Sequence, residues 1–173
     1  MLKPFLTANW RYLAMLNFEV DPKILAPHVP VGTQLDFHND KTYVSVVGFL
    51  FYHTIVCGLP IPRHRNFEEV NLRFYVRKKS ADTWRRGVVF IREHYWGYTA
   101  RGERTSEYRV EHSRWKIWLA DSFELKANIA TLYGEKFIEP LRAKPVSAFI
   151  ADGSYVEVQR RTIEPEPGSR FTG

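Results

Sequence analysis

One stretch of the sequence alternates apolar and polar side chains, which places hydrogen-bonding groups in a single row. Val70, Leu72, Phe74 and Val76 alternate with Asn71, Arg73, Tyr75 and Arg77. Successive side chains of a β-strand point to opposite faces, so the stretch predicts a strand with one apolar and one polar or amphipathic face. If the polar face lines a cavity, its side chains would bind a ligand. A strand whose polar face meets water shows the same pattern, so both interpretations stay open.

The sequence motifs of several catalytic and metal sites do not occur in the chain. Ser45 and Ser154 lack the Gly-x-Ser-x-Gly context of a nucleophile elbow, and no Walker or dinucleotide-binding glycine pattern is present. Cys57 is the single cysteine, which excludes an intrachain disulfide and a zinc site built on cysteines. The histidines show no ligand spacing such as His-x₃-His. We therefore predict no metal site and assign no cofactor.

The chain is basic, with 25 Lys and Arg residues against 19 Asp and Glu residues and a formal net charge of +6. Residues 63–86 hold eight of the basic residues but only three acidic ones, Glu68, Glu69 and Asp82. A basic patch attracts phosphate backbones and anionic metabolites. No helix-turn-helix, zinc-finger or RNP-type pattern accompanies the charge, so nucleic-acid binding ranks below a solvated basic surface as an interpretation.

Two short helices are predicted. Asp21 is a favourable N-cap and Pro22 suits the first helical position, so a helix is expected near residues 22–28. Apolar residues recur at helical spacing from Leu125 onward and predict a second helix within about residues 126–138.

Most of the other predicted elements are strands. Residues 41–53 are too rich in β-branched and aromatic side chains for a helix, and predict a long strand covered on both faces, with Gly48 at a bend or close approach. A closing strand over residues 146–158 is interrupted at the turn dipeptide Asp152-Gly153. The remaining predicted strands cover residues 70–77, 87–92, 105–112 and 114–120, with a polar hairpin connection at residues 78–86.

Composition and pattern together predict a single α+β domain that is mainly an antiparallel, barrel-like β-sheet. Hydrophobic residues make up 45% of the 173 residues and aromatic residues 15%, a share that favours pleated surfaces. We expect the domain to cover residues 1–162 and residues 163–173 to form a flexible tail. The chain shows no signal-peptide pattern and no apolar run of about 18 residues, so we expect a cytoplasmic protein that does not enter a membrane.

Several stretches of the chain together match a known family pattern. The most specific is Glu69-Val70-Asn71-Leu72-Arg73 in its context. The others are Ala8-Asn9-Trp10-Arg11 ahead of Asp21-Pro22, residues 43–49, 58–62, 64–68, 94–99, 108–112 and 151–154, and Trp115. Up to about Thr162, the chain resembles the YqjF-like family of uncharacterised bacterial proteins, the domain of unknown function 2071. The family is placed in the acetoacetate decarboxylase-like superfamily, which implies a β-barrel that encloses a cavity and is flanked by a few helices.

The resemblance implies two charged site residues. Arg11, by its position ahead of Asp21, resembles a superfamily arginine that faces the cavity, and Glu69 resembles a cavity glutamate. We expect both to point inward and to pair with each other or a ligand, because an unpaired charge inside a barrel is costly, with Asn71 or Arg73 on the same face. The pair would bind a carboxylate or carbonyl ligand. An ion pair that only joins two strands is an equally weighted alternative.

The lysine of the superfamily's chemistry has no evident counterpart. Decarboxylases of this type act through a lysine that forms a Schiff base. The adjacent pair here, Lys78-Lys79, follows a strand in a polar turn, where the ammonium groups stay solvated and are poor nucleophiles. In the family, several dozen residues that include a Lys-Lys pair separate the counterparts of Glu93 and His94, which are adjacent here. That segment is either deleted or not included in the sequence.

The leading hypothesis is a small-molecule-binding barrel of the acetoacetate decarboxylase-like type without the Schiff-base lysine. Its candidate ligand-binding residues are Arg11, Glu69, Asn71 and Arg73, and its expected partner is a small acidic or carbonyl ligand. The sequence leaves open the oligomeric state and whether the protein is an enzyme or a non-catalytic carrier. The alternative is a basic surface that binds nucleic acid or another polyanion through residues 63–86. Added salt would weaken such binding steeply.

Overall fold

The computed structural model describes residues 4–80, 83–95, 98–104, 108–109, 116–119, 133–153 and 155–158. Strands dominate this part of the chain. They are β1 (Leu6–Val20), β2 (Gln34–Leu35), β3 (Thr42–Val56), β4 (Phe67–Ser80), β5 (Thr83–Tyr95), β6 (Tyr98–Arg104), β7 (Tyr108–Arg109), β8 (Lys116–Leu119), β9 (Ser147–Asp152) and β10 (Tyr155–Val158).

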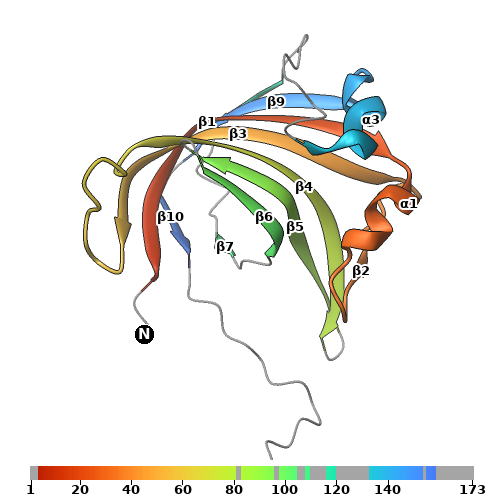
Figure 1. Ribbon diagram of the computed structural model, residues 1–173, viewed down its shortest axis with the longest axis horizontal. Helices are drawn as coiled ribbons and strands as arrows, with labels where there is room; N and C mark the ends of the chain where they lie inside the picture. Colours follow the sequence, from red (N-terminus) through yellow and green to blue (C-terminus); the bar gives the residue numbers. More distant parts are fainter. Residues whose placement is uncertain are drawn as a thin grey trace, which may run out of the picture.

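The described strands form one strongly curved antiparallel sheet (Figure 1). Neighbouring strands follow the order β6-β5-β4-β3-β1-β10-β7, β2 pairs with β4, and β9 pairs with both β1 and β8. Within the described residues the two ends of this order do not pair, so the sheet is open. The predicted antiparallel, β-rich fold is confirmed, whereas a closed barrel is not found in this part of the chain.

Most predicted strands are present, but the hairpin connection is shorter than predicted. Strands β4 and β5 continue into residues 78–86, and the ladder reaches the pair Ser80 and Thr83. The polar composition of this segment suggested a connection, whereas the backbone hydrogen bonds of a ladder are available to polar residues as well. The predicted interruption at residues 152–153 separates β9 from β10. The predicted strand over residues 105–112 lies largely outside the described residues.

The longest element that the sequence analysis did not identify is β1. This strand pairs with β3, β9 and β10. Its register against β3 shifts between Arg11 and Ala14, and Tyr12 has a φ of 52°, so the strand carries a bulge. The bulge breaks the alternation of apolar and polar residues: Ala8 and Trp10 are followed by Leu13 and Met15 on the same face. A simple period of two therefore does not run through the strand.

The first predicted helix is confirmed. Helix α1 (Pro22–Leu25) continues as the 3₁₀ helix η1 (Ala26–His28), and the Asp21 side chain accepts a hydrogen bond of 2.8 Å from the backbone N–H of Lys23. The second predicted helix falls mainly on residues outside the described ranges. After Gly134, with a φ of 94°, the chain forms η3 (Glu135–Phe137) and α3 (Ile138–Arg142).

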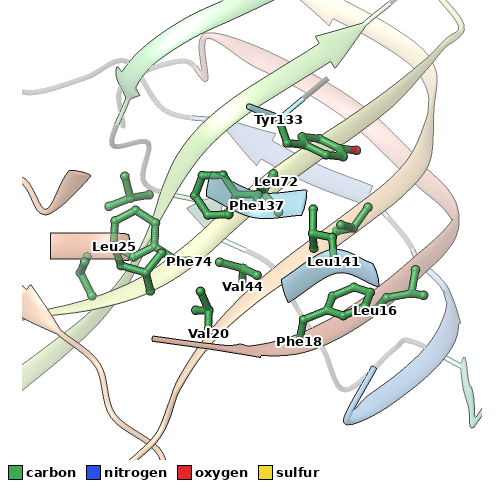
Figure 2. Packing of buried hydrophobic residues seen from close by; sticks show 13 residues of the cluster. Leu16, Phe18, Val20, Leu25, Val44, Leu72, Phe74, Tyr133, Phe137 and Leu141 are labelled. Atoms are coloured by element: carbon green, nitrogen blue, oxygen red, sulfur yellow. The ribbon is translucent and has the colours of Figure 1, made fainter. Parts of the chain in front are cut away.

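Two apolar clusters lie on opposite faces of the central strands. The first connects β1, β3, β4 and β5 with the helices, and Figure 2 shows Tyr133, Phe137 and Leu141 packed over the strands. It consists of Leu16, Phe18, Val20, Leu25, Val44, Val46, Leu72, Phe74, Val76, Val89, Tyr133, Phe137 and Leu141. The second consists of Ala8, Trp10, Leu13, Met15, Val47, Phe49, Phe51, Ala151 and Val156. Adjacent residues of β3 belong to different clusters, so we distinguish a helix-covered face from a second face.

Two expectations on the location and ends of the chain stay predictions. Among the described residues, no helix is long and apolar enough to cross a membrane. The expected tail at residues 163–173 lies outside the described ranges.

Replacing Tyr133 with Phe should reduce the loss of stability at alkaline pH. Tyr133 is 3% exposed, and its burial raises the pKa of the phenol from 10.0 to about 12. The folded pKa lies above the unfolded one, so the stabilisation is complete below about pH 10 and is lost as the pH rises towards about 12. Two pKa units correspond to about 2–3 kcal/mol.

Urea unfolding of both proteins at neutral and at alkaline pH measures this effect. The stability of the wild type should fall more steeply than that of Tyr133→Phe, whose side chain has no proton to lose. An equal decrease in both proteins would contradict the assignment.

Candidate functional site

Four successive polar side chains in the middle of β4 lie on the second face, and we call them the β4 polar row: Glu69, Asn71, Arg73 and Tyr75. Their neighbours Leu72 and Phe74 belong to the helix-covered cluster, which fixes the row on the opposite face. Asn71 is 1% exposed and Glu69 8% exposed, while Arg73 and Tyr75 are half-buried. The predicted alternation is thus confirmed, and the inner part of the polar face is buried rather than open to water.

Glu69 and Asn71 are hydrogen-bonded to each other. The Nδ2 atom of Asn71 donates to Oε1 of Glu69 at 2.9 Å. The Oδ1 atom of Asn71 is buried and has no hydrogen-bond partner in the described structure. The row therefore presents a buried amide oxygen that is able to accept a hydrogen bond.

Arg73 lies two residues further along the strand. Its Nη2 atom lies 3.9 Å from the sulfur of Met15, and its Nε atom is buried and has no hydrogen-bond partner in the described structure. Residues two apart on a strand have Cα atoms about 6.6 Å apart. An acceptor at Asn71 and a cationic donor at Arg73 therefore lie next to each other on one face.

The fourth member of the row, Tyr75, is held by a chain of polar groups that crosses the sheet. Ser45 donates its hydroxyl proton to Oδ1 of Asn17, and its oxygen lies 2.6 Å from the hydroxyl of Tyr75. Because Ser45 has one proton, Tyr75 is the donor in the second contact. Nδ2 of Asn17 donates to Ser147 at 2.8 Å. These bonds fix the Tyr75 hydroxyl at the end of the row.

The sequence analysis did not identify Asn17 and Ser45 as site residues. Asn17 lies on β1, a strand that the sequence analysis did not identify because its bulge breaks the alternation of apolar and polar residues. Ser45 stands within an otherwise apolar run, where a fully buried hydroxyl requires a partner. That single polar residue in the run of β3 was the available signal.

Arg11 does not meet Glu69. The guanidinium of Arg11 forms a two-pronged ion pair with Asp152, with Nε 2.6 Å from Oδ1 and Nη2 2.8 Å from Oδ2. The adjacent Trp10 belongs to the second face, so Arg11 points to the other side of the sheet. The pair joins β1 to β9, and the side chain of Arg11 is 41% exposed. The expected juxtaposition with Glu69 is therefore wrong, and the bulge of β1 is its physical cause.

The basic segment at residues 63–86 is divided between the two ends of β4. Arg63 and Arg65 lie in the loop that precedes the strand, while Lys78 and Lys79 lie at its far end and are exposed. The exposure of both lysines agrees with the expectation that their ammonium groups are solvated. Lys78 lies seven positions after Asn71, about 23 Å along an extended strand. Neither lysine is a member of the β4 polar row.

The chain is continuous through Glu93 and His94. Both belong to β5 and pair in register with Asn71 and Val70 of β4. The β4–β5 ladder therefore runs through the position at which the family pattern has its additional segment. Among the residues that the structure describes, no three His, Cys, Asp or Glu side chains are grouped as metal ligands.

Arg11→Met and Asp152→Asn should each cause a small loss of stability, and the double variant should lose little more than either single one. The hydrogen bond and the charge of Asp152 raise the pKa of Arg11, so the two groups stabilise each other. The pair is partly exposed, so salt should screen the interaction. Thermal unfolding of the wild type, the two single variants and the double variant at low and high salt checks this. Losses of stability that add up in the double variant and do not change with salt would contradict it.

Two solved structures are similar to this chain at low identity. One is an acetoacetate decarboxylase-like enzyme from Sphingomonas wittichii RW1, with a TM-score of 0.49 and 13% identity, covering 93% of this chain and 94% of that chain. The other is the enduracididine biosynthesis enzyme MppR complexed with pyruvate, with a TM-score of 0.46 and 12% identity, covering 91% and 89%.

Sequence comparison gives a closer relationship. The uncharacterized protein YqjF of Bacillus subtilis is 35% identical over 72 residues, which are 41% of this chain and 30% of YqjF, so the matched stretch spans less than a third of that relative. The sequence pattern of the uncharacterized conserved proteins called domain of unknown function 2071 matches residues 7–93 and 90–154. The two matched parts overlap at residues 90–93, directly before the Glu93–His94 junction. With most of its length matched, the chain belongs to the family of domain of unknown function 2071.

Proposed function

We propose that this protein binds a small carboxylic acid through the β4 polar row. The proposal agrees with the expected acidic or carbonyl ligand and keeps Glu69, Asn71 and Arg73 as binding residues. Arg11 is assigned to the Asp152 pair instead, on the other side of the sheet.

The observation that carries the proposal is the pair of unsatisfied atoms, Oδ1 of Asn71 and Nε of Arg73. Buried polar atoms normally have hydrogen-bond partners, and an unsatisfied one costs about 1–3 kcal/mol. Here two such atoms of opposite hydrogen-bonding character are neighbours on one strand face. A ligand that accepts from Arg73 and donates to Asn71 would satisfy both.

The chemistry of these two groups defines the class of ligand. A guanidinium binds carboxylates with charge-assisted hydrogen bonds. An amide oxygen accepts from a hydroxyl or an amine. A carboxylic acid with a neighbouring hydroxyl group, such as a 2-hydroxy acid, carries both functions.

Binding is proposed here rather than Schiff-base catalysis. The acetoacetate decarboxylase-like resemblance implies a reactive lysine beside the ligand, whereas Lys78 and Lys79 are exposed at the far end of β4. Lysines that water surrounds stay protonated at neutral pH and do not attack carbonyl groups.

Calorimetric titration with lactate and pyruvate tests the proposal. Lactate has a carboxylate and a hydroxyl donor, whereas pyruvate has a carboxylate and a second acceptor, which leaves Asn71 unsatisfied. We expect lactate to bind about tenfold more tightly. Arg73→Met should weaken both ligands, and Asn71→Leu should remove the preference for lactate.

Stability of the free protein gives a second readout. If the guanidinium of Arg73 serves a ligand, Arg73→Met should leave the unliganded fold as stable as before, or about 1 kcal/mol more stable, since an unsatisfied buried donor is removed. Arg142→Met, on α3, is a matched control that should leave binding unchanged. Lost binding in Arg11→Met with intact binding in Arg73→Met would place the ligand on the other side of the sheet and overturn the proposal.

A further inference from the structure

The tip of the β4–β5 hairpin, residues 77–80 and 83–86, is an unusual β-ladder because cations stand opposite cations. Arg77 pairs in register with Arg86, and Lys78 with Arg85. Like charges directly opposite each other on a sheet destabilise it. The ladder nevertheless continues through both pairs, so the hairpin keeps a concentrated positive charge at a cost to its own stability.

Only part of this charge is compensated within the described structure. Arg86 forms an ion pair with Asp36, and the guanidinium of Arg77 lies 4.6 Å from the centre of the Trp84 ring. Lys78, Lys79 and Arg85 are exposed and form no ion pair with any described residue. Three cations at one tip therefore remain available to an anionic partner.

Trp84 adds a second kind of contact to the same tip. It pairs in register with Lys79 and is 47% exposed, an unusual exposure for an indole ring. Alternation along the two strands puts Trp84 on the side of Lys79, Arg77 and Arg86. The Trp84 ring contacts one arginine and has further cations on its side of the hairpin. Such a ring can stack on a planar base while the cations bind phosphates.

We propose that the tip of the β4–β5 hairpin binds single-stranded nucleic acid, with Trp84 stacking on a base and Lys79 contacting a phosphate on the same side of the hairpin. Lys78 and Arg85, which are paired in register on the opposite side, contact phosphates as the strand passes around the tip. This assignment narrows the basic segment at residues 63–86 to one end of β4. Arg63 and Arg65 lie at the opposite end of the strand, and the loop there has no exposed tryptophan. The surface is separate from the β4 polar row, so the two proposals stand or fall independently.

Fluorescence anisotropy with a labelled oligothymidylate tests this binding at low and at physiological salt. The wild type should bind at low salt and weaken steeply as salt is added. Trp84→Ala should lower the affinity about tenfold, the usual contribution of one stacked base. Lys78→Ala/Arg85→Ala should reduce the slope of log affinity against log salt by about 1.4, since each lost phosphate contact on a single strand contributes about 0.7.

Arg63→Ala/Arg65→Ala is the matched control, because it removes the same number of charges from the other end of β4. It should lower the affinity less than the hairpin variant and leave the effect of Trp84→Ala unchanged. Thermal unfolding shows whether the hairpin variant is folded. Lys78→Ala/Arg85→Ala should be at least as stable as the wild type, because it removes a like-charge pair.

Three results would overturn the proposal. The first is no binding of the oligonucleotide even at low salt. The second is equal losses of affinity in the hairpin variant and the control variant. The third is an affinity for duplex DNA or for phosphatidylserine vesicles that equals the affinity for the oligonucleotide and is unchanged in Trp84→Ala. This result would assign the tip to polyanions or lipid surfaces without base stacking.

Discussion

The bulge at Tyr12 decides which side chains of β1 face which side of the sheet, and much of the structure depends on that choice. A bulge adds one residue to one strand of a pair, so it changes the parity of everything that follows. Trp10, before the bulge, and Met15, after it, share one face, and Leu16 and Phe18 are thereby directed to the helices. Without the extra residue, the second half of β1 would turn its apolar side away from α3.

The same shift places two polar residues of β1, Asn17 and Arg11, on opposite faces of the sheet. Asn17, after the bulge, faces Ser45 and completes the chain that fixes Tyr75. Arg11, before it, is directed to Asp152. In the middle of β4 the second face thus holds Arg73 beside a chain of hydrogen-bonded hydroxyl and amide groups. Within one row, the hydroxyl of Tyr75 is hydrogen-bonded to Ser45, whereas Arg73 and Asn71 each keep an unsatisfied atom, to which the proposed ligand would bond.

How much of this the sequence predicted depends on how local each signal was. The helix at Asp21 was predicted because its cap lies within three residues, and the polar row because alternation in β4 is uninterrupted. Strand β1 was missed because its alternation changes parity at Tyr12, and the Arg11–Asp152 pair because its partners are 141 positions apart. Glu69 is buried and is hydrogen-bonded to Asn71 rather than paired with Arg11. Which distant strand lies beside Arg11 is a property of the sheet order, and no local pattern encodes it.

Strand β4 carries two costly features, and its place in the sheet explains how it tolerates them. At its middle it buries polar groups that are not fully paired, and at its end it opposes cations to cations. Between these regions Leu72, Phe74 and Val76 are 0–3% exposed and pack into the helix-covered cluster. Burial of a side chain of this kind contributes about 1.5–3 kcal/mol, so the three together outweigh a single unsatisfied atom, which costs about 1–3 kcal/mol. A central strand, paired with β3 on one side and β5 on the other, is therefore the element on which unfavourable polar groups are held in a fixed register.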